Sequence, residues 1–276
     1  MESLAERLGA DADDRLLIIS ADLMGTSHAA NAACFDAVRT GIATTATIAV
    51  PGPWARHAAM EYRGADIGVH LTLNAQLEAL RWGPITHAPS LLDGEGGFPR
   101  TVEDLWDHAD LDEVRRELRS QLERAVLWGF NITHLTSHLN ALQGRPEFFD
   151  IYLDLAVEYH LPLRLEGAAH QDTAGFPFRQ LAAEEGVLAP DHFTFARGLT
   201  TERLAEIVAE LSPGVTELFV EPAADTEELR AADPDADVRV EAAAALRPDG
   251  KLADAIAAAG VTLIDYRPLR ALQRTA

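Results

Sequence analysis

Short apolar segments alternate with amphipathic stretches along most of the chain. Residues 16–19 form an apolar run that predicts a buried strand, and residues 27–40, which follow Gly25, predict a helix. The same pattern predicts further strands at residues 43–50, 65–71, 132–135, 162–165, 216–220 and 261–265. It predicts further helices at residues 53–63, 101–128, 146–160, 201–211 and 251–259. This alternation is typical of parallel α/β folds.

Two intervals interrupt the alternation. Residues 74–98 contain several glycines and prolines, so we expect a long loop of the kind that carries function. Residues 167–198 have a mixed pattern and give no assignment. Because no linker or composition break divides the chain, we expect one domain over residues 1–276. Its parallel sheet is either open and doubly wound or closed into a barrel.

Charge and composition narrow the classes of partner. The formal net charge of −21 disfavours nucleic acid and anionic lipid, and it favours a neutral or cationic small molecule or a divalent cation. The single Cys34 cannot form an intramolecular disulfide, and residues 1–14 are acidic without an apolar run. No stretch approaches the ~20 apolar residues that cross a bilayer. We therefore expect a cytoplasmic protein with no membrane partner, and the sequence leaves open whether it forms a homo-oligomer.

Three polar residues fall just past the ends of predicted strands, namely Asp22, His70 and His138. In parallel α/β folds the carboxyl ends of the strands meet at one edge, where ligands bind. One carboxylate and two imidazoles form a common ligand set for a hydrolytic divalent metal. Taken singly, such an Asp is often a helix N-cap and such a His often a packing residue, so the prediction depends on all three meeting.

Several motifs carry a resemblance to a known family. Residues 16–50 contain a strand, Ala21-Asp22 and Gly25, and residues 68–76 read GVHLTLNAQ. Residues 133–141 read THLTSHLNA, and residues 216–225 read TELFVEPAAD. In this order the motifs resemble the YdjC/ChbG-type carbohydrate deacetylases over roughly residues 15 to 270.

The resemblance implies a distorted β/α barrel that removes the acetyl group from N-acetylated sugars with a divalent metal, Zn²⁺ or Mg²⁺. Matched residue by residue, Asp22 corresponds to the catalytic base, and His70 and His138 correspond to metal ligands. The small-molecule substrate implied is a carbohydrate.

Three positions depart from the family pattern. Leu23 stands where the resemblance implies a metal-ligating Asp, and Thr136 stands where it implies an Asp before Ser-His. Glu221 stands where it implies a His, at a position suited to protonating the leaving amine. Either Asp22 shifts to the metal, or Glu221 or a water completes the shell, or the metal is weak or absent.

Four further residues are candidates for binding the substrate. Trp82, in the long loop beside Arg81, is the preferred residue for stacking on a sugar ring, and anchoring of the loop carries equal weight. His28 begins a predicted helix and either lines the pocket or caps and packs. Arg164 lies near a strand end and either contacts substrate oxygens or forms a salt bridge.

Three functions follow from these residues. The first is a metal-dependent deacetylase that hydrolyses the acetamide of an N-acetylated amino sugar or glycoconjugate, with Asp22 as base and Glu221 as acid. The alternative is a catalytically impaired barrel that binds a carbohydrate or a partner protein. A third is a changed reaction, such as C–O hydrolysis or an isomerisation, in which Glu221 is the working carboxylate.

Overall fold

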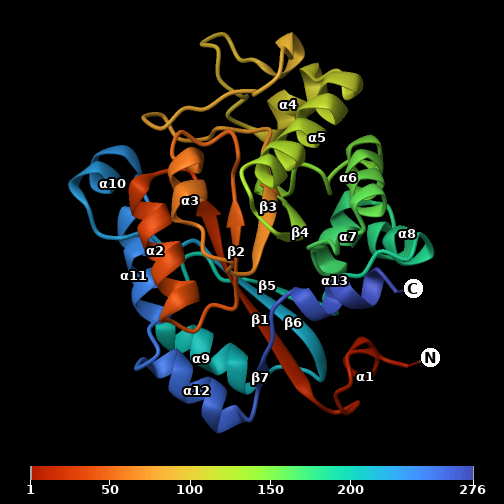
Figure 1. The fold of residues 1–276 in the computed structure, drawn as a ribbon, viewed down its shortest axis with the longest axis vertical. Coiled ribbons are helices and arrows are strands. Elements are labelled where there is room, and N and C mark those ends of the chain that lie inside the picture. Colours follow the sequence, from red (N-terminus) through yellow and green to blue (C-terminus); the bar gives the residue numbers. More distant parts are fainter. Residues whose placement is uncertain (1, 276) are drawn as a thin grey trace.

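A curled parallel sheet forms the centre of the molecule in a computed structural model, which describes residues 2–275 (Figure 1). Every paired strand runs parallel to its neighbour, in the order β4-β3-β2-β1-β6-β5, with β7 also paired to β1. The strands are β1 (Arg15–Met24), β2 (Thr45–Ile48), β3 (Ile67–Leu71), β4 (Ile132–Ser137), β5 (His192–Phe195), β6 (Gly214–Val220) and β7 (Thr262–Leu263). The sheet curls into a half-barrel surrounded by helices, which confirms the expected distorted β/α barrel.

Strand β1 is the longest of these strands and lies near the middle of the sheet. Its register with β6 runs from Arg15 to Ala21, and its register with β2 begins at Ser20. Nearly all of its residues are buried, because helices and loops cover both faces of a parallel sheet. Its C-terminal end therefore lies inside the barrel mouth, where it delivers Asp22.

Helices cover the outside of the sheet (Figure 1). In the first half of the chain they are α1 (Leu4–Arg7), α2 (His28–Arg39), α3 (Ala55–Glu61), η1 (Pro89–Leu91), α4 (Val102–His108) and α5 (Leu111–Leu127). In the middle they are η2 (His138–Asn140), α6 (Pro146–Tyr159), α7 (Ala168–Ala174), α8 (Phe178–Glu184) and α9 (Thr201–Ala209). Near the C-terminus they are α10 (Glu227–Ala232), α11 (Ala236–Ala245), α12 (Lys251–Ala259) and α13 (Arg267–Gln273).

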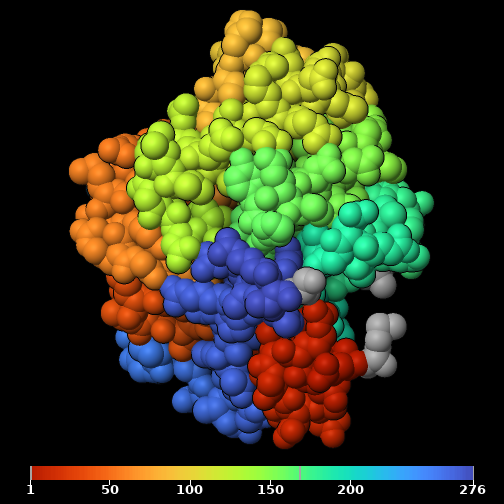
Figure 2. All heavy atoms as spheres, turned by 45° about the vertical axis from the view of Figure 1, so that its right-hand side comes forward, coloured from red at the N-terminus to blue at the C-terminus, as the bar shows by residue number. Residues whose placement is uncertain are grey.

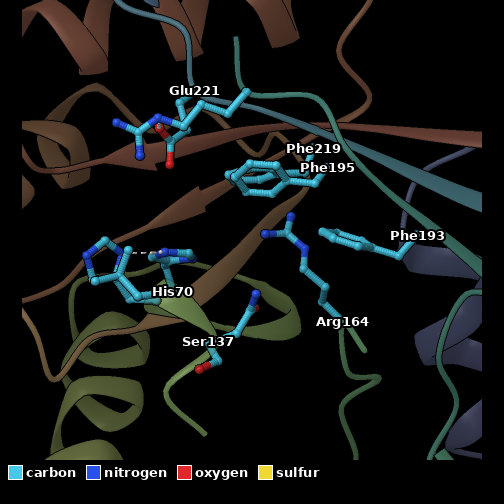
Figure 3. Close-up of a pocket in the computed structure, with 11 residues that line it drawn as sticks. His70, Ser137, Arg164, Phe193, Phe195, Phe219 and Glu221 are labelled. Atoms are coloured by element: carbon cyan, nitrogen blue, oxygen red, sulfur yellow. Dashed lines mark hydrogen bonds and ion pairs between the residues drawn. The ribbon is translucent and has the colours of Figure 1, made fainter. Parts of the chain in front are cut away.

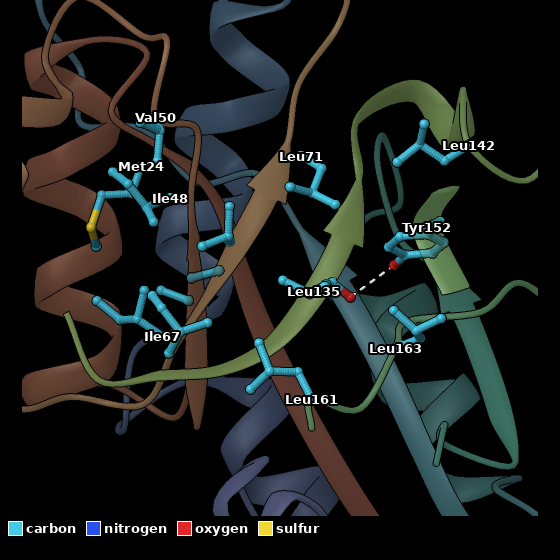
Figure 4. Packing of buried hydrophobic residues seen from close by; sticks show 14 of the residues in the cluster. Met24, Ile48, Val50, Ile67, Leu71, Leu135, Leu142, Tyr152, Leu161 and Leu163 are labelled. Carbon is cyan, nitrogen blue, oxygen red and sulfur yellow. Dashed lines mark hydrogen bonds between the residues drawn. The ribbon is translucent and has the colours of Figure 1, made fainter. Parts of the chain in front are cut away.

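Aliphatic side chains of the strands fill the space between sheet and helices (Figure 4). The buried Tyr152 of α6 donates its hydroxyl to the backbone oxygens of Leu135 (2.8 Å) and Arg164 (3.1 Å). A phenol in the core needs such a partner, because an unpaired buried hydroxyl costs free energy. These bonds tie α6 to β4 and to the segment that carries Arg164.

The predicted strands and helices are found with differences in three places, and α1, α10, α11 and α13 lie where no element was predicted. The helix expected over residues 101–128 is two helices, because Asp110 adopts an extended conformation and accepts hydrogen bonds from the first turn of α5 as its N-cap. The strand expected at residues 162–165 is reduced to one bridge between Leu163 and Leu135. The unassigned interval 167–198 contains α7, α8 and β5.

The C-terminal helix α13 packs between the N-terminal segment and the region of α5 and α6 (Figure 2). Tyr266 and Leu269 share a buried cluster with Leu4, Ile18 and Val215. The two ends of the chain are thereby held against the first strand. None of the helices in the described part of the chain has the length and apolar character needed to span a membrane.

Candidate functional site

A cavity of about 50 Å³ opens where the C-terminal ends of the strands meet (Figure 3). Polar, cationic and aromatic side chains from β3, β4, β5, β6 and the segments after them share its wall. The lining comprises His70, Ser137, His138, Leu139, Asn140, Arg164, Phe193, Phe195, Arg197, Phe219 and Glu221. Residues from distant parts of the sequence thus meet in one place, as the parallel topology requires.

The two imidazoles of the site contact each other. His70 Nε2 lies 3.0 Å from His138 Nδ1, and both side chains are almost fully buried. On its other side, His70 Nδ1 lies 2.6 Å from Thr136 Oγ1 and 3.5 Å from Asp22 Oδ2. His138 Nε2 lies 2.8 Å from Gln76 Oε1. The structure therefore brings together the two histidines and the aspartate on which the sequence prediction depended.

Burial keeps both rings neutral at physiological pH. It lowers the pKa of His70 to about 3, and the positive charge of Arg164 adds to this effect. Burial also places the pKa of His138 well below its ordinary value, with further contributions from His70 and Arg197. A neutral imidazole has one donor and one acceptor nitrogen, so a chain from Thr136 through both rings to Gln76 satisfies all four ring nitrogens.

Asp22 takes part in a buried ion-pair network. Arg164 donates from Nη1 to Asp22 Oδ2 (2.5 Å) and from Nη2 to Asp22 Oδ1 (3.0 Å). The same guanidinium donates to Glu217 Oε1 from Nε (2.9 Å) and Nη2 (2.6 Å). Ser20 Oγ and Tyr266 Oη add bonds to Asp22 and Glu217, at 2.6 and 2.7 Å. Both oxygens of Asp22 are therefore engaged before any ligand arrives.

These donors do not complete a metal site. No three His, Cys, Asp or Glu side chains within residues 2–275 are placed to hold one ion. Leu23 offers an apolar side chain where a third donor is needed, and the Asp22 oxygens are bound to Arg164 and Ser20. A divalent metal in a hydrolase usually has three protein ligands, so the residues present do not fit such an ion as a full set.

The backbone at Leu23 nevertheless has an unusual conformation. Its φ of 71° lies in the left-handed region, which a leucine adopts at a cost of roughly 1 kcal/mol and which Asp and Asn tolerate better. Leu139 and Asn140, which line the cavity just after His138, also have positive φ angles of 50° and 54°. The strained positions thus lie beside the site residues, where tertiary packing holds them.

Glu221, at the end of β6, lies across the cavity from the imidazoles (Figure 3). Its Oε2 is 3.3 Å from Arg197 Nε, and the residue is only 8% exposed. Burial raises the pKa of Glu221, and the charges of Arg197 and Arg239 oppose this shift. A carboxyl group with a raised pKa is protonated more readily than an ordinary one and is the better proton donor.

Three phenylalanines from β5 and β6 form the remaining wall, and the sequence analysis did not propose them. Phe195 and Phe219 stack with their centroids 5.2 Å apart and an interplanar angle of 26°. The guanidinium of Arg164 lies 5.0 Å from the Phe219 centroid and 5.7 Å from that of Phe193. The alternation in Phe193-Thr194-Phe195 was the available signal, but it falls in the unassigned interval 167–198.

Among the candidates for substrate binding, the structure places Arg164 in the cavity and the other three elsewhere. Trp82 is buried and donates from Nε1 to the Asn74 backbone oxygen at 2.9 Å, so it anchors the long loop. Arg81 bonds to Asp93 and to loop backbone oxygens within the same loop. His28 packs edge-on against Trp54, with centroids 5.2 Å apart, outside the cavity lining.

Comparisons with known proteins agree with this architecture. A model of the YdjC-like protein family matches residues 16–253. A carbohydrate deacetylase from Thermus thermophilus is 40% identical over 59% of this chain, and the match spans 60% of that relative, less than two thirds of its length. A carbohydrate deacetylase from Geobacillus stearothermophilus is 32% identical over 92% of this chain and 97% of the relative. A crystal structure of a proposed cellobiose-phosphate cleavage protein from Enterococcus faecalis has a TM-score of 0.81 and 25% identity, covering 93% of this chain and 99% of that one.

Proposed function

Because the chain belongs to the YdjC-like family, we propose that it hydrolyses the acetamide of an N-acetylated amino sugar or glycoconjugate in the cavity between His70 and Glu221. One observation carries the proposal: a pair of neutral imidazoles faces a buried carboxyl group of raised pKa across one cavity. This arrangement offers a proton acceptor and a proton donor on two sides of a bound amide. The two relatives are named carbohydrate deacetylases, which supports the substrate class.

The proposed proton transfers use groups on opposite walls of the cavity. A water molecule attacks the acetamide carbonyl and gives its proton to the imidazole pair once the hydrogen bond between His70 and His138 opens, and the carboxylate of Asp22 beside His70 Nδ1 stabilises the charge. The guanidinium groups of Arg164 and Arg197 place positive charge near the oxyanion that forms. Glu221 then donates its proton to the leaving nitrogen as the C–N bond breaks. The products are acetate and the free amino sugar.

Weak or absent binding of Zn²⁺ or Mg²⁺ in the natural chain is part of the proposal. Two imidazoles are the available protein donors, and they must first give up their mutual hydrogen bond. The left-handed backbone at Leu23 is compatible with an Asp, so one substitution tests what this position controls. We therefore expect Leu23→Asp to supply the missing third donor without a change of backbone.

The test measures metal binding and acetate release together. Leu23→Asp should bind Zn²⁺ at least about tenfold more tightly than the natural chain in calorimetry, and its melting temperature should rise with added Zn²⁺. Leu23→Asn is the matched control, since it has the same size and backbone tolerance without the carboxylate. Acetate release from N,N′-diacetylchitobiose should be slow in the natural chain and faster in Leu23→Asp. Absence of acetate from both proteins, with metal and over a panel of N-acetylated sugars, would falsify the hydrolase.

A second function is favoured by the closed hydrogen-bonding of the site. Asp22 is fully engaged with Arg164 and Ser20, and the imidazole nitrogens are satisfied by one another, Thr136 and Gln76. Such a site suits a barrel that binds an N-acetylated sugar without turnover. Stabilisation of the natural chain by diacetylchitobiose, with no acetate released, distinguishes this function from the hydrolase.

A further inference from the structure

One aromatic ring at the cavity has a free face. Phe195 is 54% exposed although it lines the cavity, and Phe219 stacks against it while being only 6% exposed. Figure 3 shows both rings extending toward the space between Glu221 and His70. An exposed phenylalanine inside a ligand cavity is unusual because its apolar surface gains free energy only when something covers it.

The ring is also supported on one face. Phe219 supports it from beneath, and the Arg164 guanidinium supports Phe219 at 5.0 Å from its centroid. Arg164 cannot easily move because it donates to both Asp22 and Glu217. A stacking surface that is already ordered loses little conformational entropy when a ligand binds.

Polar groups surround this aromatic surface on the cavity wall. Arg197, Glu221, Ser137 and Asn140 line the same cavity and can bond to hydroxyl groups. A ligand that fits must therefore have one flat apolar face and a polar rim. A pyranose has this form, because its C–H groups lie on its faces and its hydroxyls at the edge.

We propose that Phe195 is the platform on which the apolar face of a pyranose ring stacks, and that it sets the preference of the site for cyclic sugars. The proposal rests on the proposed function for the identity of the site, and it deepens it by assigning a specificity-determining residue. It also gives Phe195 the stacking role that the sequence analysis proposed for Trp82, whose ring is buried beneath the long loop.

Calorimetry with two disaccharides tests the platform. We expect Phe195→Ala to raise the Kd of both N,N′-diacetylchitobiose and cellobiose by about tenfold, and Phe195→Trp to keep or lower it. Leu127→Ala is the matched control, because Leu127 is 83% exposed at the end of α5, outside the cavity lining, and its loss should leave both Kd values unchanged. The melting temperature of Phe195→Ala should stay close to that of the natural chain, since the ring is exposed.

The two disaccharides separate this proposal from the proposed function. Preference of the natural chain for diacetylchitobiose over cellobiose reports recognition of the acetamido group, whereas the effect of Phe195→Ala reports stacking. If the natural chain binds both disaccharides with equal affinity and Phe195→Ala weakens both, the platform is supported. Recognition of the acetamido group, and with it the proposed deacetylase substrate, is then contradicted. Unchanged Kd values in Phe195→Ala, or no binding of either sugar to the natural chain, would overturn the platform. Reduced self-association of Phe195→Ala with unchanged sugar affinity would instead assign the ring to a protein contact.

Discussion

Two buried polar clusters lie at different heights along the same sheet, and they bury charge in different ways. The paired cluster, toward the C-terminal ends of the strands, comprises Asp22, Arg164, Glu217 and Tyr266. The base cluster, at the N-terminal ends, comprises Thr45, Asp66, Thr133 and His134. In the paired cluster a guanidinium balances two carboxylates. In the base cluster Asp66 Oδ2 and His134 Nε2 have no hydrogen-bond partner within the described residues.

The difference appears in the pKa values of the two clusters. Burial alone would lower the pKa of Arg164, but Asp22 and Glu217 outweigh it and hold this pKa well above its ordinary value. Burial raises the pKa of Asp66 to about 6, and hydrogen bonds from Thr45 and Thr133 only partly offset the shift. The Arg164 guanidinium of the paired cluster thus stays charged at neutral pH, whereas Asp66 of the base cluster titrates near pH 6.

The largest expected effect comes from breaking the paired cluster. Arg164→Met should lower the free energy of unfolding by about 3–5 kcal/mol, because it leaves two buried carboxylates without a counter-charge. Denaturant titration measures this loss. The control is Arg230→Met, which removes an exposed arginine from ion pairs with Asp225 and Asp237 and should cost far less, because solvent screens these pairs. Equal losses in the two variants would show that the buried pairing does not matter.

In the base cluster we expect a smaller change in the free energy of unfolding, of opposite sign. The pKa of Asp66 is about 6 in the folded chain and 3.8 in its reference state, so the free energy of unfolding falls as pH rises through this window. Asp66→Asn removes the titration, so at pH 8 it should be more stable than the natural chain by up to about 3 kcal/mol. At pH 4 the two proteins should have nearly equal stability. A difference that does not depend on pH would contradict the assignment.

The smallest effect compares one threonine from each cluster region. Thr136→Val removes the 2.6 Å partner of His70 Nδ1 and should cost about 1 kcal/mol at both pH 4 and pH 8, since His70 stays neutral at both. Thr133→Val removes a 2.9 Å bond to Asp66 Oδ1 and should cost more at pH 8, where Asp66 is charged. Thermal unfolding at the two pH values measures both. If both variants lose stability with the same pH dependence, the two ends of the barrel do not differ in titration as we expect.

Local sequence patterns predicted most of the strands and helices and several of the site residues. Apolar runs predicted β1, β2, β3, β4 and β6, because a strand buried on both faces has a continuous apolar sequence. The parallel order of strands then placed Asp22, His70 and His138 at one edge, and the structure brings them within hydrogen-bond distance of one another or of shared partners. The family resemblance singled out Glu221, and a place near a predicted strand end singled out Arg164; both line the cavity.

The remaining features depend on contacts between distant segments. One helix ends with its cap at Ala109 and another begins with its cap at Asp110 within a single amphipathic pattern, so periodicity alone predicted one helix. Trp82 and Arg81 lie in a loop whose fold is fixed by its own hydrogen bonds. These bonds keep both side chains out of the cavity lining, although the Trp82 ring packs edge-on behind His138. Strand β5 has only four residues, and its partners on β6 lie more than twenty residues further along the chain.

The sequence by itself determined the alternation of strands and helices, and hence which residues reach the mouth of the barrel. Both follow from periodicity and from the direction of parallel strands. Only the tertiary structure decided the state of those residues: Asp22 bound to Arg164, the imidazoles bound to each other, and Phe195 left with one free face. Pairing, burial and stacking depend on groups far apart in the chain, and their energies arise only when folding removes the water between them.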